Sequence, residues 1–349
     1  MKAAILYTQN QPLVIEDLSL PPLEYGQVLV ELVASGLCGS QVLEITGKRG
    51  KDLYLPHTLG HEGSGIVLEC GPGVTKVKPG DHVVLSWIKG SGIEAPSPRY
   101  KTSSHVINSG PITTFQTHSI VSENRITPIA PKIPLEEAAL IGCAVSTGLG
   151  IALHEAELKP HHSIAVFGVG GIGLNVIQGA SLCGTRLILA VDIYNHKLEM
   201  AKTLVATHVI RSDLENGIDI IFSLTEGKGV DFAIECAGTR QTMENAFKVT
   251  KPKGGKTILA GNLQKGSSIE IDPFDLILGK NIVGTWGGKT NPDRDFPKYL
   301  QWYMEGKLKL KELISHRFPL GDINHAFDAL RRGEILRSII YFKGPSFGA

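Results

Sequence analysis

Three residues whose side chains bind metals are spread over the first half of the chain. Cys38 lies in the segment GLCGS, His61 in GHEG and Cys143 in GCAVSTGLG. Taken singly, a cysteine is most often a small buried apolar residue, and a histidine is often hydrogen-bonded in the core. Together they supply two thiolates and one imidazole, a three-ligand set that leaves a fourth position open, as catalytic zinc requires. Spacing along the chain does not by itself establish that the three side chains meet.

A glycine motif of the form G-x-G-x-x-G follows a β-branched segment and precedes an expected helix. Gly168 permits a tight turn, Gly170 allows a pyrophosphate to approach the backbone, and Gly173 allows helix and sheet to pack closely. The helix N-terminus offers free N–H groups and a positive dipole end to phosphates. We therefore predict a dinucleotide-binding turn, the alternative being a glycine-rich turn without a ligand. The predicted binding residues are Gly168, Gly170, Gly171, Ile172 and Gly173.

Asp192 is expected at the end of the strand that follows the glycine motif. A carboxylate there accepts hydrogen bonds from the ribose hydroxyls of the cofactor and repels a 2′-phosphate. The next residues, Ile193 and Tyr194, offer no cation for such a phosphate. We therefore expect NAD rather than NADP.

The composition limits the classes of partner. The 349 residues carry 35 Lys and Arg against 34 Asp and Glu, a net charge of +1, without a basic block. Nucleic acids and anionic membranes require a clustered positive excess, so we expect neither as a partner. No segment has the roughly 18 apolar residues of a membrane span, and the N-terminal residues lack a signal-peptide pattern. The five scattered cysteines do not suggest disulfides, so we expect a cytoplasmic protein.

Hydrophobic patterning predicts two kinds of domain. Residues 1–135 contain short apolar runs between turn residues, as in a β-rich domain; the runs include 27–33, 64–69 and 82–85. From about residue 149 strands alternate with helices, which predicts a doubly wound parallel sheet and an α/β fold class. The expected strands there are 164–167, 186–191, 232–235 and 257–259, and the expected helices are 171–182 and 196–204. We also expect a loop over 89–110, helices over 296–306 and 323–332, and a strand over 338–342.

Several separated motifs resemble, in the same order, those of the zinc-containing medium-chain alcohol and polyol dehydrogenases over nearly the whole chain. They are GLCGS, GHEGSG, VKPGD, GCAVSTGLG, the glycine motif and GEILRS. The resemblance implies a GroES-like catalytic domain of residues 1–148 and 287–349. It also implies a Rossmann NAD-binding domain of residues 149–286, and a homodimer.

The resemblance further implies roles for single residues around the metal. Cys38, His61 and Cys143 correspond to the ligands of one catalytic zinc ion. Ser40 corresponds to the hydroxyl that takes the substrate proton. Glu62 corresponds to an acid beside the zinc, or else is a buried structural acid; either way it needs a partner, because an unpaired buried carboxylate is costly.

Three more residues correspond to positions around the cofactor and the substrate. Arg337 resembles the residue that pairs with the cofactor pyrophosphate, the alternative being a solvated surface arginine. Thr147 resembles a residue beside the nicotinamide. Trp87 falls where the family has an aromatic wall of the substrate pocket, and the alternative is core packing.

The chain also departs from the family. No cysteine lies between Cys70 and Cys143, so we expect no structural zinc. Gln41 replaces an Asp that orients the zinc-bound histidine. Leu43 replaces a histidine that, in several members, passes the proton to solvent. The cations Lys48, Arg49 and Lys51 indicate either a solvated loop or a site for an anionic or sugar-like substrate.

We therefore expect a zinc-dependent, NAD-linked oxidoreductase that acts on an alcohol, a polyol or a sugar-like substrate, or on the corresponding carbonyl. Zinc would act as a Lewis acid on the substrate oxygen. Two alternatives remain open: a zinc-free NAD(P)H quinone or enone reductase, and a non-catalytic NAD-binding protein. Metal content tests the first alternative, and cofactor reduction with a broad substrate panel tests the second.

Overall fold

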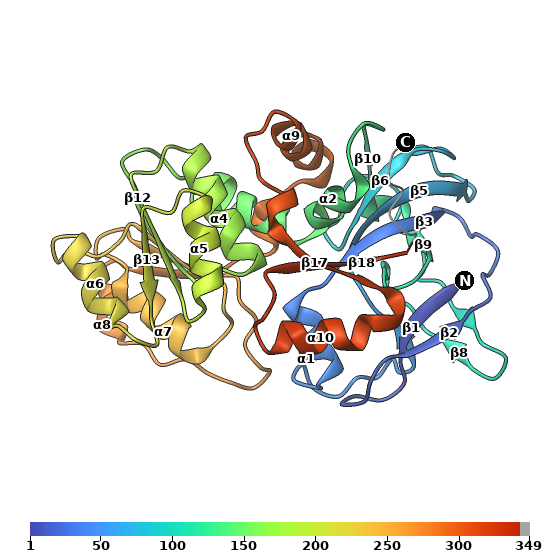
Figure 1. Cartoon of the computed structure of the whole chain (residues 1–349), viewed down its shortest axis with the longest axis horizontal. Coiled ribbons are helices and arrows are strands. Elements are labelled where there is room, and N and C mark those ends of the chain that lie inside the picture. Colours follow the sequence, from blue (N-terminus) through green and yellow to red (C-terminus); the bar gives the residue numbers. More distant parts are fainter. Residues whose placement is uncertain (343–349) are drawn as a thin grey trace. The chain divides into compact units, whose positions relative to one another are not determined.

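The computed structural model describes residues 1–342, and the chain divides into two compact units (Figure 1). Unit 1 comprises Met1–Cys143 together with Asn291–Ala349, and unit 2 comprises Ala144–Thr290. The predicted fold class, a β-rich domain plus a parallel-sheet α/β domain, is confirmed.

Unit 1 is built mainly of strands. Its strands are β1 (Lys2–Leu6), β2 (Val14–Asp17), β3 (Gln27–Gly36), β4 (His57–Thr58), β5 (Glu62–Cys70), β6 (His82–Ser86), β7 (Tyr100–Lys101), β8 (Val106–Ile107), β9 (His118–Ser122), β10 (Ile126–Ile129), β17 (Ile314–Pro319) and β18 (Arg337–Tyr341). Its α-helices are α1 (Gly39–Ile45), α2 (Leu135–Ala139), α9 (Pro292–Met304) and α10 (Ile323–Arg331).

Strand β3 is the centre of the larger sheet in unit 1. The sheet order is β10-β6-β5-β3-β18-β17, and β9 also pairs with β3. Alternate residues of β3, such as Val28 and Val30, are fully buried against Val83 and Leu85 of β6, as expected for a strand with one face in the core. Because β18 pairs antiparallel with β3, segments from both ends of the sequence form one sheet.

The predicted loop over residues 89–110 contains the short hairpin of β7 and β8. The carboxylate of Glu123 stabilises the start of this loop. It accepts hydrogen bonds from the backbone N–H groups of Thr75 at 2.7 Å, Lys76 at 2.8 Å and Ile93 at 2.7 Å. Burial raises the pKa of Glu123, but these donors and the Lys76 charge outweigh burial. The pKa of Glu123 is therefore below its usual value. Charge-assisted hydrogen bonds therefore stabilise this part of unit 1.

Unit 2 alternates strands and helices. Its strands are β11 (Ser163–Phe167), β12 (Leu187–Asp192), β13 (His208–Arg211), β14 (Phe232–Glu235), β15 (Lys256–Leu259) and β16 (Asn281–Gly284). Its α-helices are α3 (Ala144–Gly150), α4 (Gly171–Leu182), α5 (Asn195–Thr203), α6 (Gly217–Leu224), α7 (Arg240–Val249) and α8 (Pro273–Ile277).

The sheet of unit 2 is parallel throughout and has the order β13-β12-β11-β14-β15-β16. Phe167 and Val191 point from it into a core that includes Ile221 of α6 and Val249 of α7. Helices α4 and α5 contact β11, β12 and β13. Since parallel strands end at the same edge, the glycine motif after β11 and the end of β12 lie next to each other.

The start of α9 differs from the prediction. A helix was expected over residues 296–306, but α9 begins at Pro292. The side chain of Asn291 accepts hydrogen bonds from the N–H groups of Asp293 and Arg294, at 3.0 and 3.3 Å. An Asn cap followed by proline at the first helical position is a strong start signal, and the apolar pattern alone did not include it.

Within residues 1–342, no single helix has the length and hydrophobicity needed to cross a bilayer. One bent pair of segments, Leu135–Gly142 with Ala144–Glu155, meets that criterion by length and composition alone.

Candidate functional site

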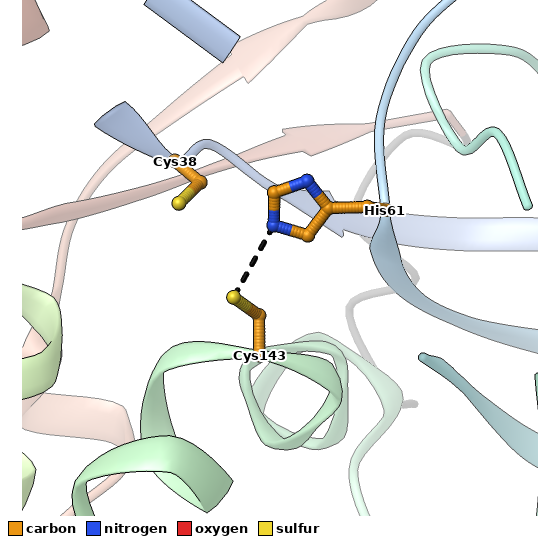
Figure 2. A group of neighbouring side chains, drawn as sticks. All are labelled: Cys38, His61 and Cys143. Carbon is orange, nitrogen blue, oxygen red and sulfur yellow. Dashed lines mark hydrogen bonds between the residues drawn. The ribbon is translucent and has the colours of Figure 1, made fainter. Parts of the chain in front are cut away.

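The structure brings Cys38, His61 and Cys143 together in unit 1. Cys38 caps the N-terminus of α1 after β3, and His61 precedes β5. Cys143 follows the turn after α2. Their metal-binding atoms all lie within 4.8 Å of one another, and His61 Nε2 is 3.2 Å from Cys143 Sγ. Figure 2 shows the three side chains pointing toward one another from separate parts of the chain.

The donor set of this cluster fits a zinc ion. Metal binding requires thiolates. The hydrogen bond with Cys143 lowers the pKa of Cys38 well below its usual value, despite burial, and the positive charges of His61 and Arg337 lower it further. The same hydrogen bond, together with burial, raises the pKa of Cys143. Two converging sulfur atoms and one imidazole nitrogen are preferred ligands of zinc.

Gln41 is buried beneath the cluster and contacts two of its residues. Its Oε1 accepts the backbone N–H of Cys38 at 3.0 Å, and its Nε2 lies 3.0 Å from His61 Nδ1. An amide facing His61 with its NH2 group favours the ring tautomer that carries the proton on Nε2. A metal bound at Nε2 requires the other tautomer, with an acceptor facing Nδ1. Turning the amide would supply that acceptor but lose the bond to Cys38.

We therefore predict that Gln41→Glu tightens zinc binding by about tenfold, because a carboxylate accepts hydrogen bonds from both Cys38 N–H and His61 Nδ1–H. Competition with a chromophoric zinc chelator measures the affinity. Gln301→Glu adds the same charge at an exposed position of α9 whose side chain is hydrogen-bonded to Glu305, and it should have no effect. Unchanged or weaker zinc binding by Gln41→Glu would contradict this account of the tautomer.

Glu62 and Arg337 form a buried ion pair beside the cluster. Their side chains are 0% and 5% exposed, and Arg337 Nη2 donates to Glu62 Oε1. Arg337 Nη1 also donates to the carbonyl of Leu37 at 2.6 Å. Arg337 is thus the partner that a buried Glu62 requires, and the alternative of a solvated surface arginine is wrong. Among residues 1–342, Glu62 Oε2 and Arg337 Nε have no hydrogen-bond partner.

Ser40 lies in the first turn of α1, and its hydroxyl donates to Cys38 Sγ at 3.3 Å. The hydroxyl therefore faces the metal-binding cluster.

The glycine motif of unit 2 has the geometry of a phosphate-binding turn. Gly168 has φ +85°, and a Cβ there would lie 2.7 Å from the backbone nitrogen of Ala237. A Cβ on Gly173 would lie 2.2 Å from the carbonyl oxygen of Gly168. In contrast, a Cβ on Gly170 would meet nothing within 4 Å. Helix α4 begins at Gly171 without a side-chain cap, so its N-terminus remains open to a pyrophosphate.

The carboxylate of Asp192 lies against this turn. It accepts the backbone N–H groups of Val169 at 2.9 Å, Ile193 at 2.8 Å and Tyr194 at 3.0 Å. Lys197, a residue outside the predicted site, lies within electrostatic reach of Asp192, with its Nζ 4.5 Å from the centroid of the Tyr194 ring. Burial lowers the pKa of Lys197, although Asp192 acts in the opposite direction. The position of this basic residue, in the first turn of the helix that follows Asp192, is the sequence feature that could have identified Lys197.

Thr147 and Trp87 lie in different environments. Thr147 is buried in α3, and within the described part of the chain its Oγ1 has no hydrogen-bond partner. Trp87 packs against the core beneath β5 and β6, and its carbonyl accepts a hydrogen bond from Arg125. The Trp87 side chain is half-buried there.

Two family models match the chain. Residues 24–131 match the alcohol dehydrogenase GroES-like domain, and residues 171–305 match the zinc-binding dehydrogenase model.

Curated relatives match over nearly the full length. The S-(hydroxymethyl)glutathione dehydrogenase of Paracoccus denitrificans is 31% identical, over 98% of this chain and 99% of its own. The class-3 alcohol dehydrogenase of Drosophila melanogaster is 32% identical, over 98% and 97%. Among solved structures, benzyl alcohol dehydrogenase from Acinetobacter calcoaceticus superposes with a TM-score of 0.88 at 28% identity, covering 98% of this chain and 99% of that one.

Proposed function

The chain belongs to the zinc-containing medium-chain alcohol dehydrogenase family, and on that premise we propose that it transfers a hydride between NAD(H) and an alcohol, polyol or sugar-like substrate, or the corresponding carbonyl. The observation that carries the proposal is the convergence of Cys38, His61 and Cys143 in a chain that also has an open dinucleotide-type turn. Neither feature is needed for a purely structural role.

We propose that residues 1–148 and 287–349 form the catalytic domain and residues 149–286 the NAD-binding domain. Cys38, His61 and Cys143 would hold one zinc ion, which when bound polarises the substrate oxygen as a Lewis acid. Glu62 would balance charge beside the ligands. Ser40 would accept the hydroxyl proton of the substrate.

The remaining proposed roles concern the cofactor and the substrate. The glycine turn, including Gly170, Gly171 and Ile172, would bind the pyrophosphate through backbone N–H groups. Thr147, whose hydroxyl has no partner among residues 1–342, would contact the nicotinamide. Arg337 would contact the pyrophosphate, and Trp87 would line the substrate pocket.

Zinc analysis combined with a substrate screen tests the proposed function. The purified protein should contain one zinc per chain and should produce NADH, detected by absorbance, with at least one alcohol, polyol, sugar or S-(hydroxymethyl)glutathione. A metal-free protein that reduces quinones or enones with NAD(P)H would support the reductase alternative. A zinc-loaded protein that binds NAD but turns over nothing would support the non-catalytic alternative.

Ser40→Ala should lower turnover by about 100-fold, the usual size of a lost acid–base contribution, while zinc content and NAD affinity stay close to the parent values. Steady-state rates under conditions where chemistry is rate-limiting measure the effect. Ser40→Thr keeps the hydroxyl and should retain most of the turnover. If Ser40→Ala keeps full turnover but unfolds more readily, the hydroxyl only caps the turn.

The double variant Asp192→Ser, Ile193→Arg should shift preference from NAD toward NADP. Removing the carboxylate should weaken NAD binding by roughly tenfold or more, because hydrogen bonds to a charged acceptor are worth about 1.5–3 kcal/mol. The added arginine, with Lys197 nearby, would favour a 2′-phosphate. The ratio of kcat/KM for the two cofactors measures the shift. An unmodified protein that binds NADP more tightly than NAD would refute the assigned role of Asp192.

We also propose a cytoplasmic homodimer that pairs through β16. The five free cysteines support a reducing compartment. Strand β16 is an edge of the unit 2 sheet, and the nearby apolar residues Ile277 and Trp286 are 77% and 81% exposed. Exposed edges with apolar neighbours are typical pairing surfaces. Sedimentation of the parent and of Ile277→Lys measures the oligomeric state.

A further inference from the structure

A second cluster of ionisable side chains lies in unit 1, next to helix α1. It consists of Glu44 in α1, Asp52 in the following loop and His57 in β4, with one side-chain nitrogen or oxygen of each lying within 4.8 Å of the others. Gln9 fixes the loop, because its Nε2 donates to the carbonyl of Gly50 at 2.9 Å and its Oε1 accepts Asp52 N–H at 3.3 Å. The cluster is therefore preformed.

His57 and Asp52 form a closed pair. His57 Nε2 is 2.8 Å from Asp52 Oδ2, and the side chains are 9% and 10% exposed. His57 Nδ1 lies 2.8 Å from the carbonyl oxygen of Thr58, and Asp52 Oδ1 accepts the N–H of Tyr54 at 2.8 Å. Both ring nitrogens of His57 are thus engaged by oxygen atoms.

Glu44 is the third member and differs from the other two. Within residues 1–342, no hydrogen bond to its carboxylate is found, and the side chain is half-buried. Helix α1 places it one turn after Ser40, and residues four apart share a face of a helix. Burial raises the pKa of Glu44 above its usual value; the nearby Asp52 adds to this, while His57, Arg49 and His61 lower it.

The proposed reaction needs such a group. Oxidation of an alcohol by NAD⁺ transfers two electrons and one hydrogen as hydride, and releases the hydroxyl hydrogen as a proton. Ser40 can take that proton only by giving up its own, and Leu43, also in α1, cannot carry one. A carboxylate whose pKa lies nearer neutrality than usual is suited to receive it.

We propose that Glu44, which lies beside the His57–Asp52 pair, receives the substrate proton by way of Ser40 and releases it to water. This rests on the proposed function. The substrate O–H bond breaks as a bond to Ser40 Oγ forms. The Ser40 proton moves to the Glu44 carboxylate, and the carboxylic acid then loses it to solvent. In carbonyl reduction the same steps run in reverse. Glu44 thus acts through Ser40 and does not touch the substrate.

Glu44→Gln in the zinc-loaded enzyme tests the kinetic part. We expect alcohol oxidation to slow by about 100-fold, with added buffer base restoring part of the rate. The parent rate should fall as acidic pH protonates Glu44, and the variant should lack this limb of the profile. Glu69→Gln, an exposed acid in β5, is the matched control and should behave as the parent does. Unchanged turnover with an unchanged pH profile in Glu44→Gln overturns the proposal.

Titration of Glu44 itself provides a readout that does not depend on turnover. In zinc-loaded protein with 13C-labelled glutamate, one carboxyl resonance that is absent in Glu44→Gln should titrate above the usual value of about 4.3. His57→Gln should move it further upward, because a nearby positive charge is lost. Titration in the usual range, or without response to His57→Gln, overturns the proposal. If this titration is as expected but the parent makes no NADH with any substrate, the proposed function has failed, and the relay fails with it.

Discussion

The double variant Cys38→Ala, Cys143→Ala is expected to contain no zinc and to lose turnover by about 1000-fold or more. The structure places the two sulfur atoms and His61 Nε2 in one cluster, so removing both thiolates leaves a single imidazole. One neutral ligand cannot hold zinc against chelation by buffer and water. Lewis-acid stabilisation is worth several kcal/mol, and each 1.36 kcal/mol is tenfold in rate. Elemental analysis and NADH absorbance measure the two quantities.

The control for this variant removes two thiols that lie outside the cluster. Cys70 ends β5 and Cys183 follows α4. A Cys70→Ala, Cys183→Ala variant should keep one zinc per chain and nearly full turnover. Retention of zinc by the Cys38→Ala, Cys143→Ala protein, or two zinc ions per chain in the parent, is the result that rules out the assigned ligands.

Replacing Arg337 by methionine should reduce the free energy of unfolding by about 3–5 kcal/mol, the usual cost of leaving one member of a buried ion pair without its partner. Glu62 is completely buried, and Arg337 is the residue that pairs with it. The Leu37 carbonyl also loses its donor. Chemical denaturation, followed by circular dichroism at a fixed pH, measures the change through the transition midpoint.

A double variant and a surface variant make this prediction specific. Glu62→Gln, Arg337→Met removes both charges and should recover much of the lost stability, because no buried charge is left unpaired. Arg332→Met breaks an exposed pair with Glu334, and exposed pairs contribute only about 0–1 kcal/mol. Equal effects of Arg337→Met and Arg332→Met would show that the buried pair has no special contribution.

Local patterns in the sequence were sufficient to predict the bounds of the helix that follows the dinucleotide turn and of a neighbouring strand. The predicted helix over 171–182 has the bounds of α4, and the predicted strand over 232–235 has those of β14. Both follow from short-range causes. Glycine easily adopts the φ that turns the chain at Gly168 before the helix, and a short apolar run precedes Glu235. The α/β fold class follows from the same alternation.

The metal-binding residue types were also evident from the sequence, but their convergence was not. Cys38 follows the end of β3, and His61 directly precedes β5. Cys143 comes from a turn much further along the chain. What brings them together is the pairing of β3 with β5 and the packing of α2 against both strands. Those contacts depend on the whole hydrophobic core of unit 1, so no local pattern encodes them.

Tertiary structure alone decided which charged groups pair. A buried Glu62 requires a partner on physical grounds. That partner is Arg337, because β18 pairs with β3 and thereby places Arg337 beside Glu62. Likewise, a fixed loop sets His57 and Asp52 next to Glu44. The sequence determines which side chains can carry charge or bind metal. The three-dimensional packing determines which of them are buried together, and burial sets how strongly they interact, because a low-dielectric interior strengthens every charge–charge contact and penalises every unpaired group.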